Sequence, residues 1–80
     1  MKYNCTWLVD FLPNRTEYAV YERDTDKLLF EGVTEIDADD AFHTVEFLKT
    51  LGVKVFNYKL NYNEQTDIVN YSGRGMLEVN

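Results

Sequence analysis

Apolar and polar residues alternate along the first part of the chain. From Tyr3 to Phe11 every second residue is apolar, and most of the residues between them are polar. A period of two is the pattern of a half-buried β-strand, because successive side chains point to opposite faces of a sheet. Pro13 is expected to end this strand, because proline donates no backbone hydrogen bond.

Two further strands are predicted at residues 17–23 and 27–33. The segment that joins them, Arg-Asp-Thr-Asp-Lys at residues 23–27, contains two aspartates. Their side chains can hydrogen-bond their own backbone in a tight turn. Residues 17–33 are therefore predicted to form a β-hairpin.

A helix is predicted over residues 38–51. Asp37 is placed to accept the free N–H groups of a first helical turn, and Asp39 and Asp40 lie where the helix dipole favours negative charge. One side of the helix is apolar and consists of Ala41, Val45 and Leu48, flanked by Ala38, Phe42, Phe47 and Leu51. The opposite side carries Asp39, His43, Glu46 and Thr50. Gly52 follows where a C-capping glycine belongs.

A long strand is predicted over residues 53–62, in which Phe56, Tyr58, Leu60 and Tyr62 alternate with polar residues. Phe56, Leu60 and at least one tyrosine are expected in the core. Residues 67–71 are predicted to return as a fifth strand, and residues 72–75 to form a loop, because glycine allows unusual backbone angles. Residues 76–80 fit either a short edge strand or a frayed tail.

These elements predict an α+β fold: a small, mostly antiparallel sheet in β-β-β-α-β-β order with one helix packed on one face. A length of 80 residues predicts a single domain over residues 1–80. The apolar share of 45%, with one proline and four glycines, is typical of a globular chain rather than a disordered one.

Cysteine usage and hydropathy bear on location. Cys5 is the one cysteine, so it has no partner for an internal disulfide, which is typical of a reducing compartment. Polar residues interrupt the N-terminal segment, so no signal peptide is predicted. No apolar run approaches the roughly 18 residues that span a bilayer. A cytoplasmic location without membrane association is expected.

The sequence offers few of the side-chain combinations that metal binding requires. Asp39, His43 and Glu46 share a predicted helix face, but structural zinc sites usually have four ligands, and no further histidine or paired cysteine completes one. No metal and no cofactor are expected.

Catalytic and calcium-binding patterns are equally incomplete. Cys5 lies at a core-facing strand position, where a thiol is usually inert. Asp24, Asp26 and Glu35 match three positions of an EF-hand loop, but leucines occupy the positions of an oxygen ligand and of the glycine turn. We therefore expect that the protein is not an enzyme.

Acidic residues are concentrated in one part of the chain. Residues 17–46 contain ten acidic and two basic residues, whereas the remainder contains four acidic and six basic residues. A concentrated acidic surface repels nucleic acid and attracts surfaces rich in Arg and Lys, so no direct binding to duplex DNA is expected. Solubility and helix capping account for the same acids in a second interpretation. The residues assigned to contacts with a basic partner are Asp24, Asp26, Glu31, Glu35, Asp39, Asp40 and Glu46.

Residues 56–75 are rich in tyrosine and asparagine, and this composition is typical of recognition surfaces. Tyr62, Tyr71 and Arg74 are the candidate anchors for a partner. Alternatively, tyrosines on a sheet beside Lys54, Lys59 and Arg74 could stack single-stranded bases. The net charge of −6 disfavours this alternative, because non-specific affinity for nucleic acid is mostly electrostatic.

In general character the chain resembles small phage-encoded proteins that block host defence or transcription machinery, a class that includes anti-CRISPR proteins and DNA mimics. It is short, acidic, rich in tyrosine and asparagine, and has no catalytic set. The resemblance covers the whole chain and involves no family motif. It agrees with the charge distribution in predicting an inhibitor or adaptor that occludes a basic, nucleic-acid-binding surface of a partner protein, for example in a nucleic-acid-processing complex.

The alternative function is a sheet-based domain that binds single-stranded RNA or DNA, or an assembly domain, through the tyrosine-rich C-terminal strands. A homodimer is compatible with either function.

Overall fold

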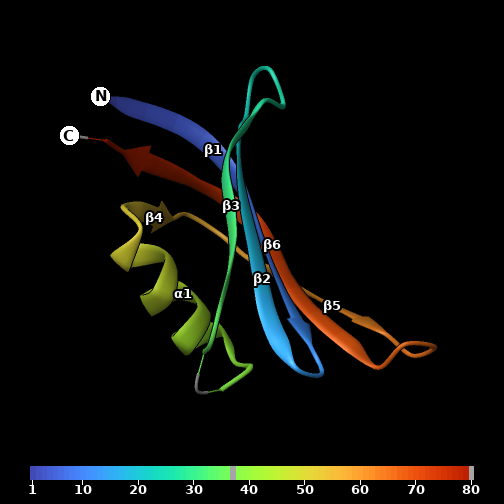
Figure 1. The fold of residues 1–80 in the computed structure, drawn as a ribbon. Helices are drawn as coiled ribbons and strands as arrows, with labels where there is room; N and C mark the ends of the chain where they lie inside the picture. The colour runs from blue at the N-terminus through green and yellow to red at the C-terminus, as the bar shows by residue number, and fades with distance from the viewer. Residues whose placement is uncertain (37, 80) are drawn as a thin grey trace.

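The computed structural model describes residues 1–36 and 38–79 (Figure 1). Its elements follow in the order β1 (Lys2–Leu12), β2 (Arg15–Glu22), β3 (Leu28–Thr34), α1 (Ala41–Thr50), β4 (Val53–Val55), β5 (Lys59–Asn63) and β6 (Ile68–Glu78). The described residues form a six-stranded antiparallel sheet with a single helix packed on it. The predicted α+β class, with three strands before the helix and the others after it, is therefore confirmed.

The two longest strands, β1 and β6, lie at the centre of the sheet. The strand order is β3-β2-β1-β6-β4, and β5 pairs with another part of β6. β1 is antiparallel to both of its neighbours, which places Trp7 opposite Val20 on one side and Gly73 on the other. The start of β1 and the end of β6 lie together (Figure 1), and the Met1 ammonium group donates a hydrogen bond to the Val79 carbonyl oxygen at 2.8 Å.

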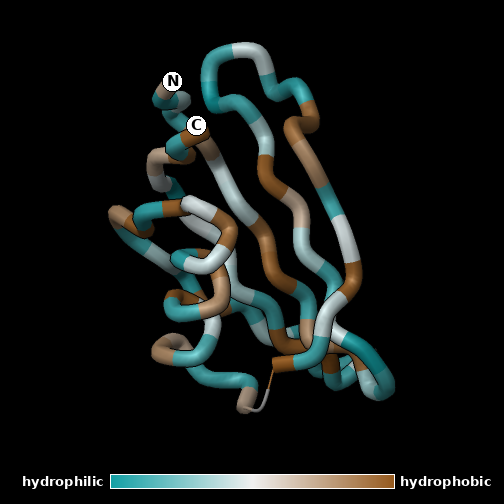
Figure 2. The backbone as a smooth tube through the Cα atoms, turned by 60° about the vertical axis from the view of Figure 1, so that its left-hand side comes forward, coloured by the Kyte–Doolittle hydropathy of each residue, from teal (hydrophilic) through white to brown (hydrophobic). Residues whose placement is uncertain are grey.

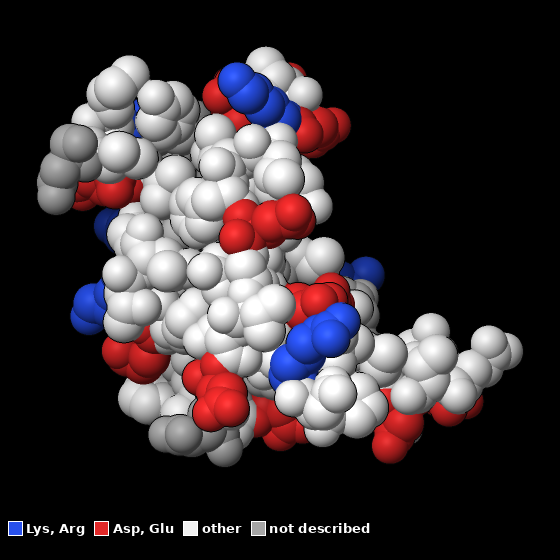
Figure 3. Space-filling model, in the orientation of Figure 1, with Lys and Arg blue, Asp and Glu red and all other residues white. Residues whose placement is uncertain are grey.

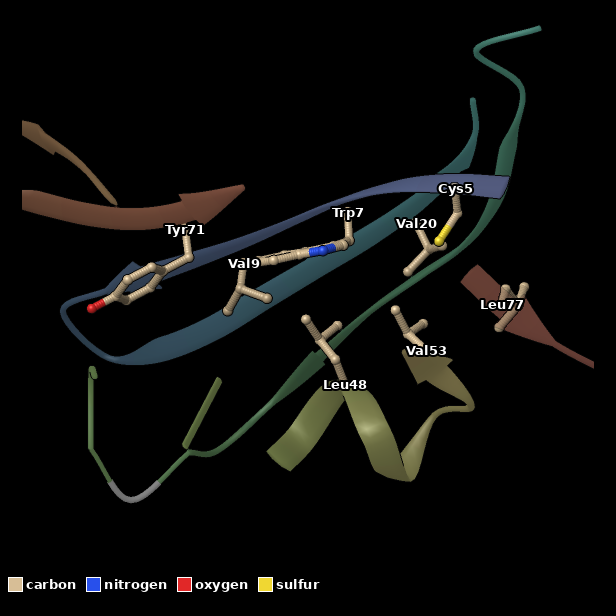
Figure 4. Close-up of a cluster of buried hydrophobic side chains, with 8 residues drawn as sticks. All are labelled: Cys5, Trp7, Val9, Val20, Leu48, Val53, Tyr71 and Leu77. Atoms are coloured by element: carbon tan, nitrogen blue, oxygen red, sulfur yellow. The ribbon is translucent and has the colours of Figure 1, made fainter. Parts of the chain in front are cut away.

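The core lies between α1 and one face of the sheet (Figure 4). Trp7 of β1 is 1% exposed, and its indole N–H donates a hydrogen bond to the Arg74 carbonyl oxygen at 3.2 Å. This bond matters because a buried donor without a partner costs about 1–3 kcal/mol. The other buried residues of the cluster are Cys5, Val9, Val20, Leu48, Val53, Tyr71 and Leu77.

The helix begins later than the sequence pattern predicts. Asp40 is the N-cap, because its carboxylate accepts the backbone N–H of His43 at 2.8 Å. The predicted cap, Asp37, lies outside the described residues, but residues 38 and 39 are described and precede the helix. At the other end Leu51 is the C-cap, and the predicted left-handed residue follows it: Gly52 has a φ of +89°, which favours glycine, and its N–H donates to the Lys49 carbonyl oxygen at 3.1 Å.

The buried side of α1 also differs from the predicted one. Thr44 and Leu48 are its buried residues, whereas Phe42, which was expected beside the apolar side, is 68% exposed. A threonine fits the core here because its hydroxyl donates to the Asp40 carbonyl oxygen at 2.8 Å and so carries no unpaired polar group inward. No helix of the described residues has the length and hydropathy needed to cross a membrane.

The predicted strand over residues 53–62 is interrupted. Val55 of β4 pairs with Gly75 of β6, and Lys59 of β5 pairs with Ser72. The chain thus advances four residues from Val55 to Lys59 while β6 advances only three. One extra residue of this kind is a β-bulge. The side chain of Asn57 lies in the bulge, where its Oδ1 accepts the Arg74 backbone N–H at 3.0 Å.

Residues 72–75, predicted as a loop, instead continue β6 through the middle of the sheet, and residues 76–78 complete the same strand. The glycines serve close packing there. A β-carbon on Gly73 would overlap the carbonyl oxygen of Asn57 and press on the indole of Trp7, and one on Gly75 would overlap the carbonyl oxygen of Lys54.

Candidate partner-binding surfaces

The acidic residues assigned to partner contacts do not form one continuous patch. Figure 3 shows acidic side chains in separate groups along the visible face. The seven residues lie in four places: Asp24 and Asp26 in the β2–β3 turn, Glu31 and Glu35 in or just after β3, Asp39 and Asp40 before α1, and Glu46 on α1.

The β2–β3 turn is hydrophilic and projects at one end of the sheet (Figure 2). The Glu22 N–H closes it by binding the Lys27 carbonyl oxygen at 2.8 Å, and Asp26 adopts a positive φ of 56° that aspartate tolerates better than most residues. Arg23 and Lys27 lie in the same turn as Asp24 and Asp26, and Figure 3 shows basic beside acidic side chains there. The turn therefore contributes little to the acidic excess.

The acids that follow the turn have fewer bases beside them. We call Glu31, Glu35 and Asp39 the acidic edge, because they lie on β3, an edge strand paired only with β2, and on the segment after it. All three are exposed. Glu35 and Asp39 line the same surface hollow as Arg15, but Arg15 is paired with Glu17 at 3.0 Å. The charges of the acidic edge are therefore open to solvent.

Asp40 has a structural role that the sequence pattern did not assign to it. Its carboxylate accepts the backbone N–H of His43 and also lies 2.7 Å from the Nδ1 of His43. These two hydrogen bonds with His43 lower the pKa of Asp40 below its ordinary value. Because this carboxylate caps α1, a substitution of Asp40 would change the helix together with any surface contact.

The structure places His43 against Asp40, and Asp39, His43 and Glu46 do not form a ligand cluster. In residues 1–36 and 38–79 no group of three or more His, Cys, Asp or Glu side chains could hold a metal ion. Cys5 lies in the core, 0% exposed, and burial raises the pKa of its thiol.

The three candidate anchors occupy different environments. Tyr62 is 54% exposed, and its hydroxyl donates to Asp67 Oδ1 at 2.5 Å, which raises the pKa of Tyr62. Arg74 is exposed on the face of the sheet that α1 does not cover. Tyr71 is only 7% exposed, and its ring packs edge-on against those of Phe11 and Tyr58. Of the three candidate anchors, Tyr71 is thus a core residue, and Tyr62 and Arg74 lie on opposite faces of the sheet.

A row of large exposed side chains lies on β5 and just before it, and of these only Tyr62 was assigned to partner contacts. Tyr58, Leu60 and Tyr62 are 55%, 54% and 54% exposed, and we call them the aromatic strip. The register places Leu60 beside Tyr71 and Tyr62 beside Val69, so the strip continues the core-side face of the sheet. Phe56 is also 53% exposed, so the prediction that Phe56 and Leu60 are core residues was wrong.

The strip is exposed because α1 does not reach it. A helix with its side chains is about 10–12 Å wide, whereas neighbouring strands are about 4.8 Å apart, so one helix covers the width of two or three strands. Figure 1 shows β5 and its end of β6 extending away from α1. The alternating sequence shows that these residues share a face, but only the position of the helix shows that the face is uncovered.

The basic residues of this region lie on the other face of the sheet. Lys54 pairs with Met76, and Lys59 pairs with Ser72, which alternates with the buried Tyr71 along β6. Arg74 lies two residues from Ser72 along β6, so both side chains lie on the same face of the sheet. The basic side chains that were expected to contact phosphates therefore lie on the face of the sheet opposite the aromatic strip.

The uncovered face also carries a row of polar side chains across neighbouring strands, which the sequence did not reveal. Asp10 faces Glu17 on β2 and Asn70 on β6, and the Asn61 amide donates to Asn70 Oδ1 at 2.9 Å. Partial burial raises the pKa of Asp10, a hydrogen bond with Asn70 opposes this effect, and the charge of Glu17 adds to it. Within the row the amides of Asn61 and Asn70 bind each other, and the charges of Asp10 and Glu17 repel.

Comparisons of this chain with protein-family models, with curated proteins and with solved structures found no match.

Proposed function

We propose that this chain is a protein-binding module, an inhibitor or adaptor that occludes a basic surface of a partner protein. The acidic edge carries the proposal. Glu31 lies on the edge strand β3, Glu35 and Asp39 on the segment after it, and all three are exposed. Neither the Arg15–Glu17 ion pair nor the Asp40–His43 contact found among the described residues involves any of them.

The spacing of the edge suggests the size of the partner surface. Glu31 and Glu35 are four residues apart, which is about 13 Å of extended chain. Duplex DNA carries one charge per about 1.7 Å of its length. The edge is therefore much less densely charged than a duplex, and it suits a local cluster of Arg and Lys better than a long nucleic-acid channel. Such a contact is steered by charge and weakened by salt.

Binding of single-stranded nucleic acid to the tyrosine-rich strands is the second candidate. The exposed rings of Tyr58 and Tyr62 favour it, because bases stack on such rings. Against it, Lys54, Lys59 and Arg74 lie on the opposite face of the sheet. One strand of nucleic acid could therefore not stack its bases on the tyrosine rings and also pair its phosphates with these basic side chains.

The test is capture of partners from a nuclease-treated lysate with the tagged chain, followed by elution in rising salt and mass spectrometry. Glu35→Lys should reduce recovery of the captured proteins and lower the salt at which they elute, because it reverses a charge of the acidic edge. Glu78→Lys, at the far end of β6, makes the same change of charge away from both β3 and the β5–β6 turn and should leave recovery unchanged. Equal losses in both variants, or no loss in either, would contradict the proposal.

A further inference from the structure

The aromatic strip is an exposed row of large side chains that the acidic edge does not explain. Exposed large apolar residues are ordinary when single, but a row on one sheet face marks an interaction site more often. Tyr58, Leu60 and Tyr62 form such a row, and each is more than half exposed. Tyrosine is favoured at such sites because its ring contributes area at low cost in side-chain entropy.

Carboxylates lie at the turn end of this strip. Asp67 accepts the hydrogen bond from the Tyr62 hydroxyl at 2.5 Å, and the exposed Glu64 lies in the same turn between β5 and β6. At the other end, Tyr58 packs against Tyr71 with ring centroids 5.9 Å apart.

We infer that the aromatic strip is a docking site for a protein segment that combines apolar side chains with arginine or lysine. Apolar side chains would cover Leu60 and the tyrosine rings, and the cations would meet Asp67 and Glu64 at the turn end. A cation over a tyrosine face adds a further attraction. The same carboxylates repel phosphate groups, which disfavours nucleic acid and anionic lipid as occupants. The inference rests on the proposed function in taking the occupant to be a protein.

The experiment titrates the isotope-labelled full chain with a short synthetic peptide in which arginine alternates with leucine. Binding should shift the backbone NMR signals of the aromatic strip. Leu60→Ser should weaken binding of the peptide roughly tenfold, as expected for an interface anchor. Lys59→Ser, on the same strand but the opposite face, should change the affinity for the peptide little. Leu60 is 54% exposed, so the variant should keep its fold, which the spectrum itself reports.

A second variant separates charge from packing. Asp67→Asn keeps an oxygen that can accept the Tyr62 hydroxyl and a residue that tolerates the positive φ of 57° found there, but it removes the charge. This variant should bind the arginine peptide several-fold more weakly than the native chain does. A peptide with glutamate in place of arginine should not bind the native chain.

Several results would overturn the inference: no binding of the arginine peptide up to millimolar concentration, equal binding of the glutamate peptide, or no effect of Leu60→Ser. Self-association abolished by Leu60→Ser would instead assign the strip to a second copy of the chain. Binding of oligothymidylate to the strip would assign it to nucleic acid. Glu35→Lys should leave peptide binding intact, so failure of the acidic edge in the capture experiment is distinguishable from failure of the strip.

Discussion

At the scale of single residues, Asp40 shows how little of a capping role can be predicted from residue type. Three aspartates precede the helix, and each is a good N-cap by composition. The choice depends on where the chain turns into the helix after β3 and on which residues must face the sheet. With Thr44 and Leu48 buried, the helix begins at Ala41 and Asp40 becomes the cap.

The cap makes a pH-dependent prediction. Hydrogen bonds from His43 lower the pKa of Asp40 below the ordinary 3.8, so the charged form is favoured in the folded chain. Its contribution to the free energy of unfolding is therefore present above pH 3.8 and is lost as the pH falls through the lowered pKa. Asp40→Ala, which removes the acceptor, should be less stable than the native chain at neutral pH, and the difference should shrink on acidification. Urea unfolding followed by Trp7 fluorescence measures it.

The matched variant is Asp40→Asn. Asparagine is also a good N-cap, so this variant should be more stable than Asp40→Ala at neutral pH. It should also be less sensitive to pH below 3.8 than the native chain, because it has no carboxylate to protonate at this position. If the difference between the native chain and Asp40→Ala grew as the pH fell, the charged cap would not be its cause.

At the scale of elements, Gly73 determines how closely two strands can approach. A β-carbon there would overlap the carbonyl oxygen of Asn57, a backbone atom that cannot move without disturbing the bulge. Gly73→Ala should lower the free energy of unfolding by about 1–3 kcal/mol or more, as overpacking does. In Gly32→Ala, the new β-carbon would meet the end of the Tyr18 side chain, which can rotate away, so the loss should be smaller. Equal stability of the two variants in thermal unfolding would contradict this account.

The elements that could be predicted from the sequence are those with a regular period. Alternation in β1 and the turn residues of the β2–β3 hairpin depend on neighbouring residues, and both predictions are confirmed. The bulge between β4 and β5 depends on how these strands pair with β6, which is distant in sequence. The alternation of apolar and polar residues runs on across the bulge, so the sequence does not reveal it. Gly73 and Gly75 favoured a loop in the sequence, because glycine is common in loops. Their actual role is to leave space for the carbonyl oxygens of Asn57 and Lys54, and only the folded structure brings those atoms beside them.

At the scale of the whole molecule, the number of charges could be predicted from the sequence but their grouping could not. The acids of residues 17–46 are adjacent in sequence, yet the structure places two of them beside Arg23 and Lys27 in a turn, uses Asp40 as a cap, and leaves Glu31, Glu35 and Asp39 along one edge. The aromatic strip was hidden for a related reason, because coverage by α1 depends on the placement of one helix over a wide sheet.

A net charge of −6 with few ion pairs predicts how the whole molecule responds to salt. In the described residues Arg15–Glu17 is the ion pair, and Asp40 contacts His43, which the net charge of −6 counts as neutral, so repulsion among the carboxylates opposes the compact state. Raising sodium chloride to about 0.15 M, where the Debye length is about 8 Å, should therefore raise the melting temperature at pH 7. For a domain of this size about 1 kcal/mol corresponds to roughly 4–8 °C, so a change of a few degrees is expected.

The variant that tests the source of this effect is the double substitution Glu31→Gln and Glu35→Gln. It removes two charges of the acidic edge with little change of shape, so it should melt at a higher temperature than the native chain in low salt and gain less from added salt. Sodium chloride is the appropriate salt, because sulfate also strengthens apolar burial. A melting temperature that falls as salt is added would show that attractive pairs outweigh repulsion in the folded chain, and the acidic edge would then be less free to bind a basic partner than proposed.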